Sequence, residues 1–363
     1  MSKRISPPIS ALLTPASRRS FLRRSAIGLG SVLGAGALGL SGMERSVFTG
    51  GSAQAAGTGG EATGPLEEVH LAWDQVEVCQ APISVALKRG MFARYGLDVK
   101  PIKFTGSTDQ LLQAIATGKA DGGIGMALRW LKPLEQGFDV VLTVGTHGGC
   151  MRLLSAPDSG ITSVGDLKGK KVAVTDAASP VRNYFSIRAA KLGINPETEI
   201  EWLQFPADLF SQALKKGEVQ AIAGNDPQAY IQWKRDGLVQ VATNLDGPDK
   251  HAVCCVMGLG GHFWRDRPKV AIALSKAIIE AQAWTAAHPD EAAKIFAPYV
   301  PGNVPVETIA AILRSQTHEL HSTGALLRQE IATFVNDLKL IHVINPTTNT
   351  QAFVDKIVVD VPA

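Results

Sequence analysis

The sequence lacks the motifs of several common enzyme classes. It contains no G-x-S-x-G nucleophile elbow and no H-E-x-x-H zinc motif, and the stretch from Gly165 to Lys170 lacks the spacing of a phosphate-binding loop. After residue 55, no uninterrupted apolar run approaches the roughly 18 residues of a membrane-spanning helix. Basic residues form no block there, which excludes the electrostatic footprint of a nucleic-acid-binding protein.

The first 55 residues have the composition of an export signal. The paired arginines Arg18 and Arg19 precede an apolar stretch from Ala26 to Leu40, and Ala53-Gln54-Ala55 offers a small-x-small cleavage site. This order is typical of a removable signal rather than of a membrane span. The arginine pair resembles the twin-arginine signal, whose cargo crosses the membrane folded. We therefore predict residues 1–55 as a twin-arginine export signal and a periplasmic mature protein.

The charge of the chain is unevenly divided. The first 55 residues hold seven Lys or Arg residues and one acid, Glu44, whereas the whole chain carries a net charge of +3. The remainder is therefore mildly acidic, at about −3. Residues 56–65 consist mainly of Gly, Thr and Ala, so we expect them to form a flexible tether.

Beyond residue 66, short apolar runs alternate with helical patterns, which is typical of α/β layering. The expected strands cover Val69–Trp73, Leu97–Phe104, Val140–Val144, Val172–Val174, Ile200–Phe205, Ala221–Gly224 and Leu238–Thr243. The expected helices cover Ile83–Tyr95, Asp109–Ile115, a stretch beginning at Ser179-Pro180, Leu209–Lys216, Val270–His288, Glu291–Phe296, Val306–His321 and Leu326–Lys339. Residues 346–363 are expected to form a C-terminal tail.

Several segments, among them Gly90 to Val99 and Gly118 to Asp121, resemble the periplasmic ABC-transporter substrate-binding proteins of the nitrate, sulfonate and taurine type. Gly90-Met-Phe-Ala-Arg-Tyr-Gly-Leu-Asp-Val99 is similar to their opening segment, and Gly118-Lys-Ala-Asp121 and Gly217-Glu-Val-Gln-Ala221 are similar to the segments before each return strand. Asp166 to Val174 is similar to the segment that enters the second lobe. The resemblance rests on the order of these segments along the chain, and it covers about residues 66–345.

The resemblance implies a fold, a mechanism and partners. The fold is α/β and two-lobed, the type II periplasmic binding protein fold, with two crossing strands as the hinge and the ligand in the cleft between the lobes. Crossings near Thr146–Pro157 and Asp246–Gly260 give lobe 1 as residues 66–152 plus 256–345 and lobe 2 as residues 153–255. The ligand is then a nitrate, sulfonate, taurine, bicarbonate or pyrimidine-type molecule, and the partner is an ABC-importer permease. We expect a monomer without enzymatic activity and without a cofactor.

Loops at the carboxyl ends of the strands supply the candidate ligand contacts, because these ends and the following helix N-termini face the crevice in open α/β sheets. Backbone N–H groups and the helix dipole there favour an anion. The loops are Asp74 to Gln80, Ser107-Thr108, Met126, Thr175 to Ser179 and Asn225-Asp226. The candidate ligand-binding residues are Asp74, Cys79, Gln80, Ser107, Thr108, Met126, His147, Cys150, Ser179, Asn225, Asp226, Cys254 and Cys255.

Each candidate has a structural alternative. Ser107, Thr108 and Ser179 are also typical helix N-caps, Asp226 before a proline is typical of a turn, and Met126 is typical of packing. The nearest arginines, Arg129 and Arg182, form no evident clamp for a strongly anionic ligand.

The four cysteines, Cys79, Cys150, Cys254 and Cys255, all fall near the predicted cleft. An even count in an exported protein favours a disulfide, with Cys150 bridging to one of the adjacent pair, or simply buried thiols. With His147, His251 and nearby methionines, the thiols also suit copper(I) or zinc. Alternation along a strand would send Cys254 and Cys255 to opposite faces, which counts against a shared site.

Two further hypotheses remain from the sequence. Cys254-Cys255-Val-Met-Gly258 weakly resembles the cysteine-rich segment of the fungal thiamine-pyrimidine synthases, although it has two consecutive cysteines rather than three and the export signal opposes a cytosolic enzyme. The alternative to a receptor is therefore an enzyme of that type or a soft-metal-binding protein. His318 and His321 lie near one face of the expected helix, either as a metal pair or as residues on the surface or packed at the edge of a lobe.

Overall fold

The structure, a computed structural model, describes residues 64–104, 108–247 and 250–362. These residues all belong to one compact unit, Gly57–Ala363. The predicted export signal, nearly all of the predicted tether and the candidate Ser107 lie outside the described residues. No helix within the three described ranges combines the length and the apolar composition that a bilayer crossing needs.

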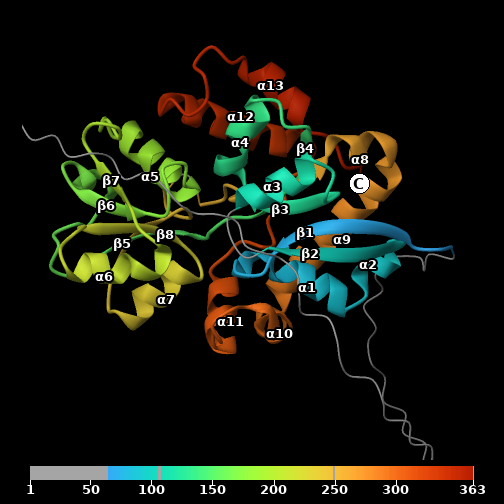
Figure 1. The fold of residues 1–363 in the computed structure, drawn as a ribbon, viewed down its shortest axis with the longest axis horizontal. Coiled ribbons are helices and arrows are strands. Elements are labelled where there is room, and N and C mark those ends of the chain that lie inside the picture. The colour runs from blue at the N-terminus through green and yellow to red at the C-terminus, as the bar shows by residue number, and fades with distance from the viewer. Residues whose placement is uncertain (1–63, 105–107, 248–249, 363) are drawn as a thin grey trace, which may run out of the picture. The chain divides into compact units, whose positions relative to one another are not determined.

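The first sheet has five strands and is mixed (Figure 1). In spatial order they are β2 (Leu97–Phe104), β1 (Glu67–Asp74), β3 (Gly122–Met126), β10 (Cys255–Gly260) and β4 (Val140–His147). β1 runs parallel to β2 and to β3, whereas β10 runs antiparallel to β3 and to β4. A strand from late in the chain is thus inserted between two early ones.

The second sheet follows the same plan. Its spatial order is β7 (Glu201–Gln204), β6 (Lys171–Val174), β8 (Ala221–Asn225), β5 (Met151–Ser155) and β9 (Val239–Thr243). β6 runs parallel to β7 and to β8, and β5 is inserted antiparallel between β8 and β9. The predicted α/β class is confirmed.

The chain passes between the two sheets twice. Residues 148–150 connect β4 to β5, and residues 244–254 connect β9 to β10. Hydrogen bonds hold the two connections side by side. The backbone N–H of Cys254 donates to the carbonyl oxygen of His147 at 2.6 Å, and the Asn244 Oδ1 atom accepts from the N–H groups of Cys150 and Met151 at 3.1 and 3.0 Å.

Helices cover both sheets. In chain order they are α1 (Ala81–Lys88), α2 (Met91–Arg94), α3 (Thr108–Ala116), α4 (Ala127–Glu135), α5 (Pro180–Lys191), α6 (Phe210–Lys215), α7 (Gln228–Arg235), α8 (Gly261–Asp266), α9 (Pro268–Ala287), α10 (Pro289–Phe296), α11 (Val306–Arg314), α12 (Gly324–Leu340) and α13 (Thr350–Ile357). Prolines begin α5, α9 and α10, where a missing N–H costs nothing. In Figure 1, α5 lies on one face of the second sheet and α6 and α7 lie on the other. Both faces of that sheet are therefore covered.

The helices α4, α7 and α8 were not expected from the sequence, and three expected segments have a different structure. The helix expected over Ile83–Tyr95 is split into α1 and α2 by Gly90, whose φ of 64° no regular helix can contain. The helix expected to reach His321 ends at Arg314. Residues 346–363, expected as a tail, contain α13, because Phe353, Val354 and Ile357 bury one side of it.

Candidate functional site

A cavity of about 490 Å³ is lined by residues from the neighbourhood of both sheets. Its walls come from segments that follow β1, β3, β6, β7 and β8, together with the starts of α3 and α5. These are the carboxyl ends of strands at which ligands bind in open α/β folds. The volume falls in the range of small-molecule sites. We therefore take this space, called the main cavity below, as the candidate ligand site.

Nine of the predicted residues line the main cavity. They are Asp74, Cys79, Gln80, Thr108, Met126, Cys150, Ser179, Asn225 and Cys255. Three others do not line the cavity. His147 and Cys254 are buried next to the cysteines that line it, and Asp226 is buried in an ion pair with Arg152. The other lining residues were not among the named candidates, and they include the charged or amide side chains of Glu77, Arg129, Asp176, Asp208 and Gln228. Asp208 follows β7, so the rule of carboxyl ends could have found it.

The loop after β1 is fixed by its own polar side chains. The Asp74 carboxylate accepts from the N–H of Val76 at 2.9 Å, and the Asp74 N–H donates to Gln80 Oε1 at 3.2 Å. The Gln80 Nε2 atom donates to the Ile124 carbonyl oxygen in β3 at 2.9 Å. Gln80 therefore positions the loop. Burial raises the pKa of Asp74 to about 6, although backbone hydrogen bonds oppose that rise.

Glu77 joins the two sides of the main cavity. The Asn225 side chain, at the end of β8, donates to Glu77 Oε1 at 2.8 Å. Burial raises the pKa of Glu77 well above its ordinary value, and the nearby negative charge of Asp74 raises it further. A cationic or hydrogen-bond-donating group in the cavity would relieve both effects.

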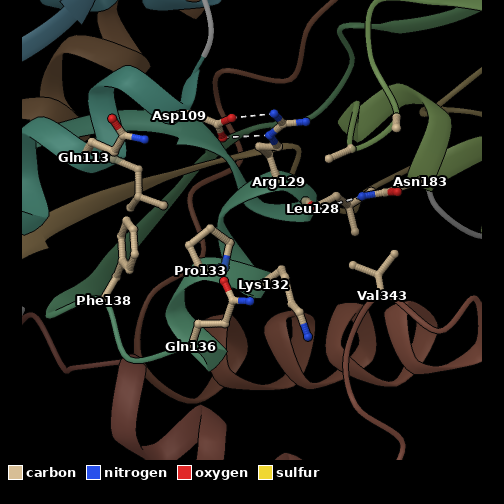
Figure 2. Close-up of a pocket in the computed structure, with 13 residues that line it drawn as sticks. Asp109, Gln113, Leu128, Arg129, Lys132, Pro133, Gln136, Phe138, Asn183 and Val343 are labelled. Atoms are coloured by element: carbon tan, nitrogen blue, oxygen red, sulfur yellow. Dashed lines mark hydrogen bonds and ion pairs between the residues drawn. The ribbon is translucent and has the colours of Figure 1, made fainter.

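The guanidinium group of Arg129 in α4 already forms ion pairs with two carboxylates. Its guanidinium group donates from Nε to Asp109 Oδ1 at 2.7 Å and from Nη2 to Asp109 Oδ2, and Figure 2 shows both bonds. The third nitrogen, Nη1, donates to Asp176 Oδ1 at 2.5 Å, and Asp176 follows β6 of the other sheet. Among the described lining residues, Arg129 is the one with a permanent positive charge. The wall of the main cavity is therefore dominated by acidic groups.

The start of α5 offers little to an anion. The Asp176 Oδ1 atom accepts from the N–H of Ala178 at 2.9 Å, and the Ser179 hydroxyl oxygen accepts from the N–H of Arg182 at 3.5 Å. Protein side chains thus already satisfy N–H groups that an anionic ligand would otherwise use. The N-cap alternative for Ser179 agrees with this geometry.

The four cysteines gather beside the main cavity and are free thiols. The Cys150 and Cys254 Sγ atoms lie 3.0 Å apart, which is longer than the ~2.05 Å of a disulfide bond. Hydrogen bonds from Cys150 and Cys255 lower the pKa of Cys254 to about 6. The expectation that strand alternation separates Cys254 from Cys255 is wrong, because Cys254 precedes the first residue of β10 and is not part of the strand.

The histidine pair does not form a metal site. His318 is buried outside any helix, and its ring nitrogens contact the side-chain oxygens of Gln282 and Gln316. Burial lowers the pKa of His318 well below its ordinary value. His318 is therefore a packed core residue, which agrees with the second of the two readings of the pair.

A second cavity, of about 300 Å³, meets the main cavity at Arg129 (Figure 2). Leu128, Pro133 and Phe138 contribute to its apolar lining, and Lys132 there is paired with Glu135 at 2.7 Å. Because its wall comes from α3, α4 and the start of α5 rather than from a series of strand ends, we assign the ligand role to the main cavity.

Comparisons with known proteins agree with this architecture. The model of the NMT1-like family matches residues 62–299. The bicarbonate-binding protein CmpA of Synechococcus elongatus is 25% identical over 272 residues, which cover 65% of this chain and 58% of that protein. The chain thus spans less than two thirds of the length of that relative.

Solved structures show the same fold. The periplasmic aliphatic sulphonate binding protein SsuA from Escherichia coli superposes with a TM-score of 0.68 at 17% identity, covering 81% of this chain and 92% of that one. The periplasmic nitrate-binding protein NrtA from Synechocystis gives a TM-score of 0.65 at 16% identity, covering 80% and 86%. The predicted type II periplasmic binding protein fold is confirmed, and the chain belongs to the NMT1-like family.

Proposed function

We propose that this protein is an extracytoplasmic receptor that binds a small molecule in the main cavity and delivers it to the permease of an ABC importer. The family membership supports this role, since the relatives named above are binding proteins. The main cavity supports it as well, because residues near both sheets line it. Export by the twin-arginine machinery, a periplasmic location and a monomeric state belong to the same proposal and rest on the sequence features.

The ligand that fits the wall is a neutral or cationic molecule with N–H donors. Asp74, Glu77, Asp176 and Asp208 line the cavity, while the charge of Arg129 is taken up by two aspartates. Those of the carboxyl groups that are ionised would repel an anion at short range in a partly desolvated space. Of the ligand classes suggested by the sequence resemblance, an aminopyrimidine-type base meets this requirement, and nitrate, sulfonates and bicarbonate do not.

Binding would draw on contacts between the two halves of the protein. Glu77 contacts Asn225 and Arg129 contacts Asp176, and each pair joins a residue near the first sheet to one near the second. A ligand that contacts residues near both sheets adds interactions that form only when the two halves of the protein are in contact. It therefore favours the arrangement with the halves in contact.

A thermal-shift screen of the full chain tests this function. The nitrogen bases 4-aminopyrimidine and acetamidinium are compared with nitrate, ethanesulfonate, bicarbonate and the zwitterion taurine. A ligand at 100 times its Kd adds about 2.7 kcal/mol to the free energy of unfolding, which shifts the melting temperature measurably. We expect stabilisation by a nitrogen base. Stabilisation by the anions alone would contradict the proposed ligand class, and the absence of any shift across a wider set of small molecules would contradict the receptor role.

The pH dependence of affinity provides a second prediction. Asp74 has a pKa of about 6 in the folded protein, so its carboxylate is mostly ionised at pH 7 and mostly protonated at pH 5. A cation that contacts the ionised form should therefore bind about tenfold more weakly at pH 5 than at pH 7. Isothermal titration with acetamidinium, whose own charge stays constant over this range, measures the change.

Matched variants separate this effect from general acid sensitivity. Asp74→Asn should bind more weakly at pH 7 and lose most of the pH dependence, whereas Asp158→Asn, an exposed aspartate outside the cavity, should behave as the wild type. An affinity that increases on acidification would mean that the ligand is repelled by the ionised carboxylates, and the assignment of a cationic ligand would be wrong.

A further inference from the structure

Five buried side chains beside the main cavity form two overlapping groups of potential metal ligands. The ligand atoms of Cys79, His147 and Cys255 all lie within 4.8 Å of one another, and so do those of Cys150, Cys254 and Cys255. We call these five residues the thiol cluster. All of them are almost completely buried, although Cys79, Cys150 and Cys255 also line the cavity. A small ion therefore has a route to the cluster from the cavity.

The sheet register assembles the cluster from distant parts of the chain. In the antiparallel pair of β10 and β4, Cys255 lies opposite His147. In the pair of β10 and β3, Cys255 lies opposite Met126, which lines the cavity. Cys79 belongs to the one-turn helix Val78–Gln80 after β1. Cys79, His147 and Cys255 are therefore held by three strands or strand ends of one sheet, a rigid support for a metal site.

His147 has the hydrogen bonding of a metal ligand. Its Nδ1 atom lies 3.1 Å from the carbonyl oxygen of Gly148. Because that oxygen can only accept, Nδ1 carries the proton, and Nε2 presents a lone pair. The Nε2 atom is buried and forms no hydrogen bond to a nitrogen or oxygen atom of the described residues, and the ring interacts with the thiol of Cys79, another member of the group. A backbone carbonyl that fixes the tautomer in this way is the usual support for a metal-bound histidine.

Charge decides between the two groups. Two thiolates and a neutral imidazole around a divalent ion give a site with no net charge, whereas three thiolates leave a net negative charge. The neutral combination is the cheaper one to bury.

We propose that Cys79, His147 and Cys255 bind a thiophilic d10 metal ion, with Zn(II) favoured over Cu(I) because it neutralises both thiolates. Sulfur and imidazole nitrogen are the ligands that these ions prefer, and zinc sites with two cysteines and one histidine complete their coordination with a water or a further ligand. Binding converts two thiols to thiolates, so two protons are released for each Zn(II) bound, and no electron is transferred. The site does not depend on which solute the main cavity takes.

Metal titration of the reduced full chain tests the proposal. After removal of metals with a chelator, Zn(II) is titrated in competition with a chromophoric chelator, and Co(II) is added separately as a spectroscopic probe. We expect one equivalent of Zn(II) and a thiolate-to-cobalt charge-transfer band in the near ultraviolet. A parallel titration with Cu(I) determines which of the two ions binds more tightly.

Variants locate the site within the cluster. His147→Gln should weaken Zn(II) binding by at least about 100-fold, since loss of a residue that only hydrogen-bonds to a metal ligand already costs up to that much. Cys79→Ser should reduce the charge-transfer band more than Cys254→Ser does, and the exposed His288→Gln should leave both readouts unchanged. The melting temperature of each metal-free variant shows whether the variant is folded. If His147→Gln does not fold, the comparison of Zn(II) affinity is made with Cys79→Ser instead.

Three results would overturn the proposal. The first is binding of Zn(II), Co(II) and Cu(I) no tighter than in the Cys79→Ser variant. The second is metal binding that His147→Gln leaves intact. The third is binding that depends on Cys150 and Cys254 but not on Cys79, which would assign the ion to the other group of thiols.

Discussion

Replacement of Arg152 by methionine is expected to lower the free energy of unfolding by about 3–5 kcal/mol. Arg152 in β5 forms a bidentate ion pair with Asp226, with Nε–Oδ1 and Nη2–Oδ2 distances of 2.7 Å each. The side chain of Asp226 is 0% exposed, and that of Arg152 is 7% exposed. Methionine would leave the Asp226 carboxylate buried without its partner. Chemical denaturation of the wild type and the variant measures the loss.

The double variant Arg152→Met, Asp226→Asn is the matched control. It removes the arginine but also the charge that the arginine neutralises, and the asparagine oxygen can still accept from the N–H of Tyr230, as Asp226 does at 3.1 Å. We expect the double variant to be more stable than Arg152→Met, because a buried pair costs less to replace than to break. A double variant as unstable as the single one would show that the loss does not come from the unpaired carboxylate, and a single variant as stable as the wild type would show that the ion pair contributes little to stability.

Replacement of Trp130 by alanine is expected to cost about 3–5 kcal/mol of stability. The Trp130 side chain is 0% exposed, and its Nε1 atom donates to the Thr108 carbonyl oxygen at 2.9 Å. Its ring fills a slot that exists because two strand residues, Gly125 in β3 and Gly258 in β10, have no side chain. A Cβ atom at Gly125 would lie 2.1 Å from the ring, and one at Gly258 would lie 2.8 Å from it. Alanine at position 130 leaves this slot empty.

Substitutions on the two sides of the slot distinguish packing from other effects. Trp130→Phe should cost less than Trp130→Ala because it fills part of the space. Gly125→Ala should destabilise by about 1–3 kcal/mol through overpacking. Gly125 also lines the main cavity, so this variant should bind the ligand more weakly. Gly165→Ala, where the new Cβ would have an ordinary contact of 3.4 Å, is the control. A Gly125→Ala variant as stable as Gly165→Ala would contradict the packing argument.

The strand ends of the site could be predicted from the sequence, since each apolar run and the polar residues after it are local features. Asp74, Asn225 and Ser179 were identified in this way, and all three line the main cavity. The thiol cluster could not be predicted. It depends on Cys255 lying opposite His147 across β10 and β4, a pairing between residues 108 positions apart. Nothing in the local sequence specifies that register.

The pKa values and the ion pairs of the cavity wall could not be predicted from the sequence either. Glu77 and Asp74 lie in the loop that the sequence predicted, but their raised pKa values arise from burial by the surrounding fold. Arg129 was noted as a cation near the cleft, yet its pairing with Asp109 and Asp176 brings together three elements that are separate in the chain. The expectation of an anionic ligand changes for this reason. A family resemblance indicates where a ligand binds, whereas the charge of the wall depends on side chains that the resemblance does not specify.

Equilibrium dialysis of the full chain against a mixture of the six test compounds, followed by mass spectrometry of the retained material, tests the receptor assignment most directly. We expect one equivalent of a nitrogen base to be retained chemically unchanged, and its retention to be lost in Glu77→Ala, which removes a carboxyl group from the cavity wall. Conversion of the retained compound into a product would show an enzyme instead of a receptor. Equal retention by the wild type and Glu77→Ala would show that the ligand binds outside the main cavity.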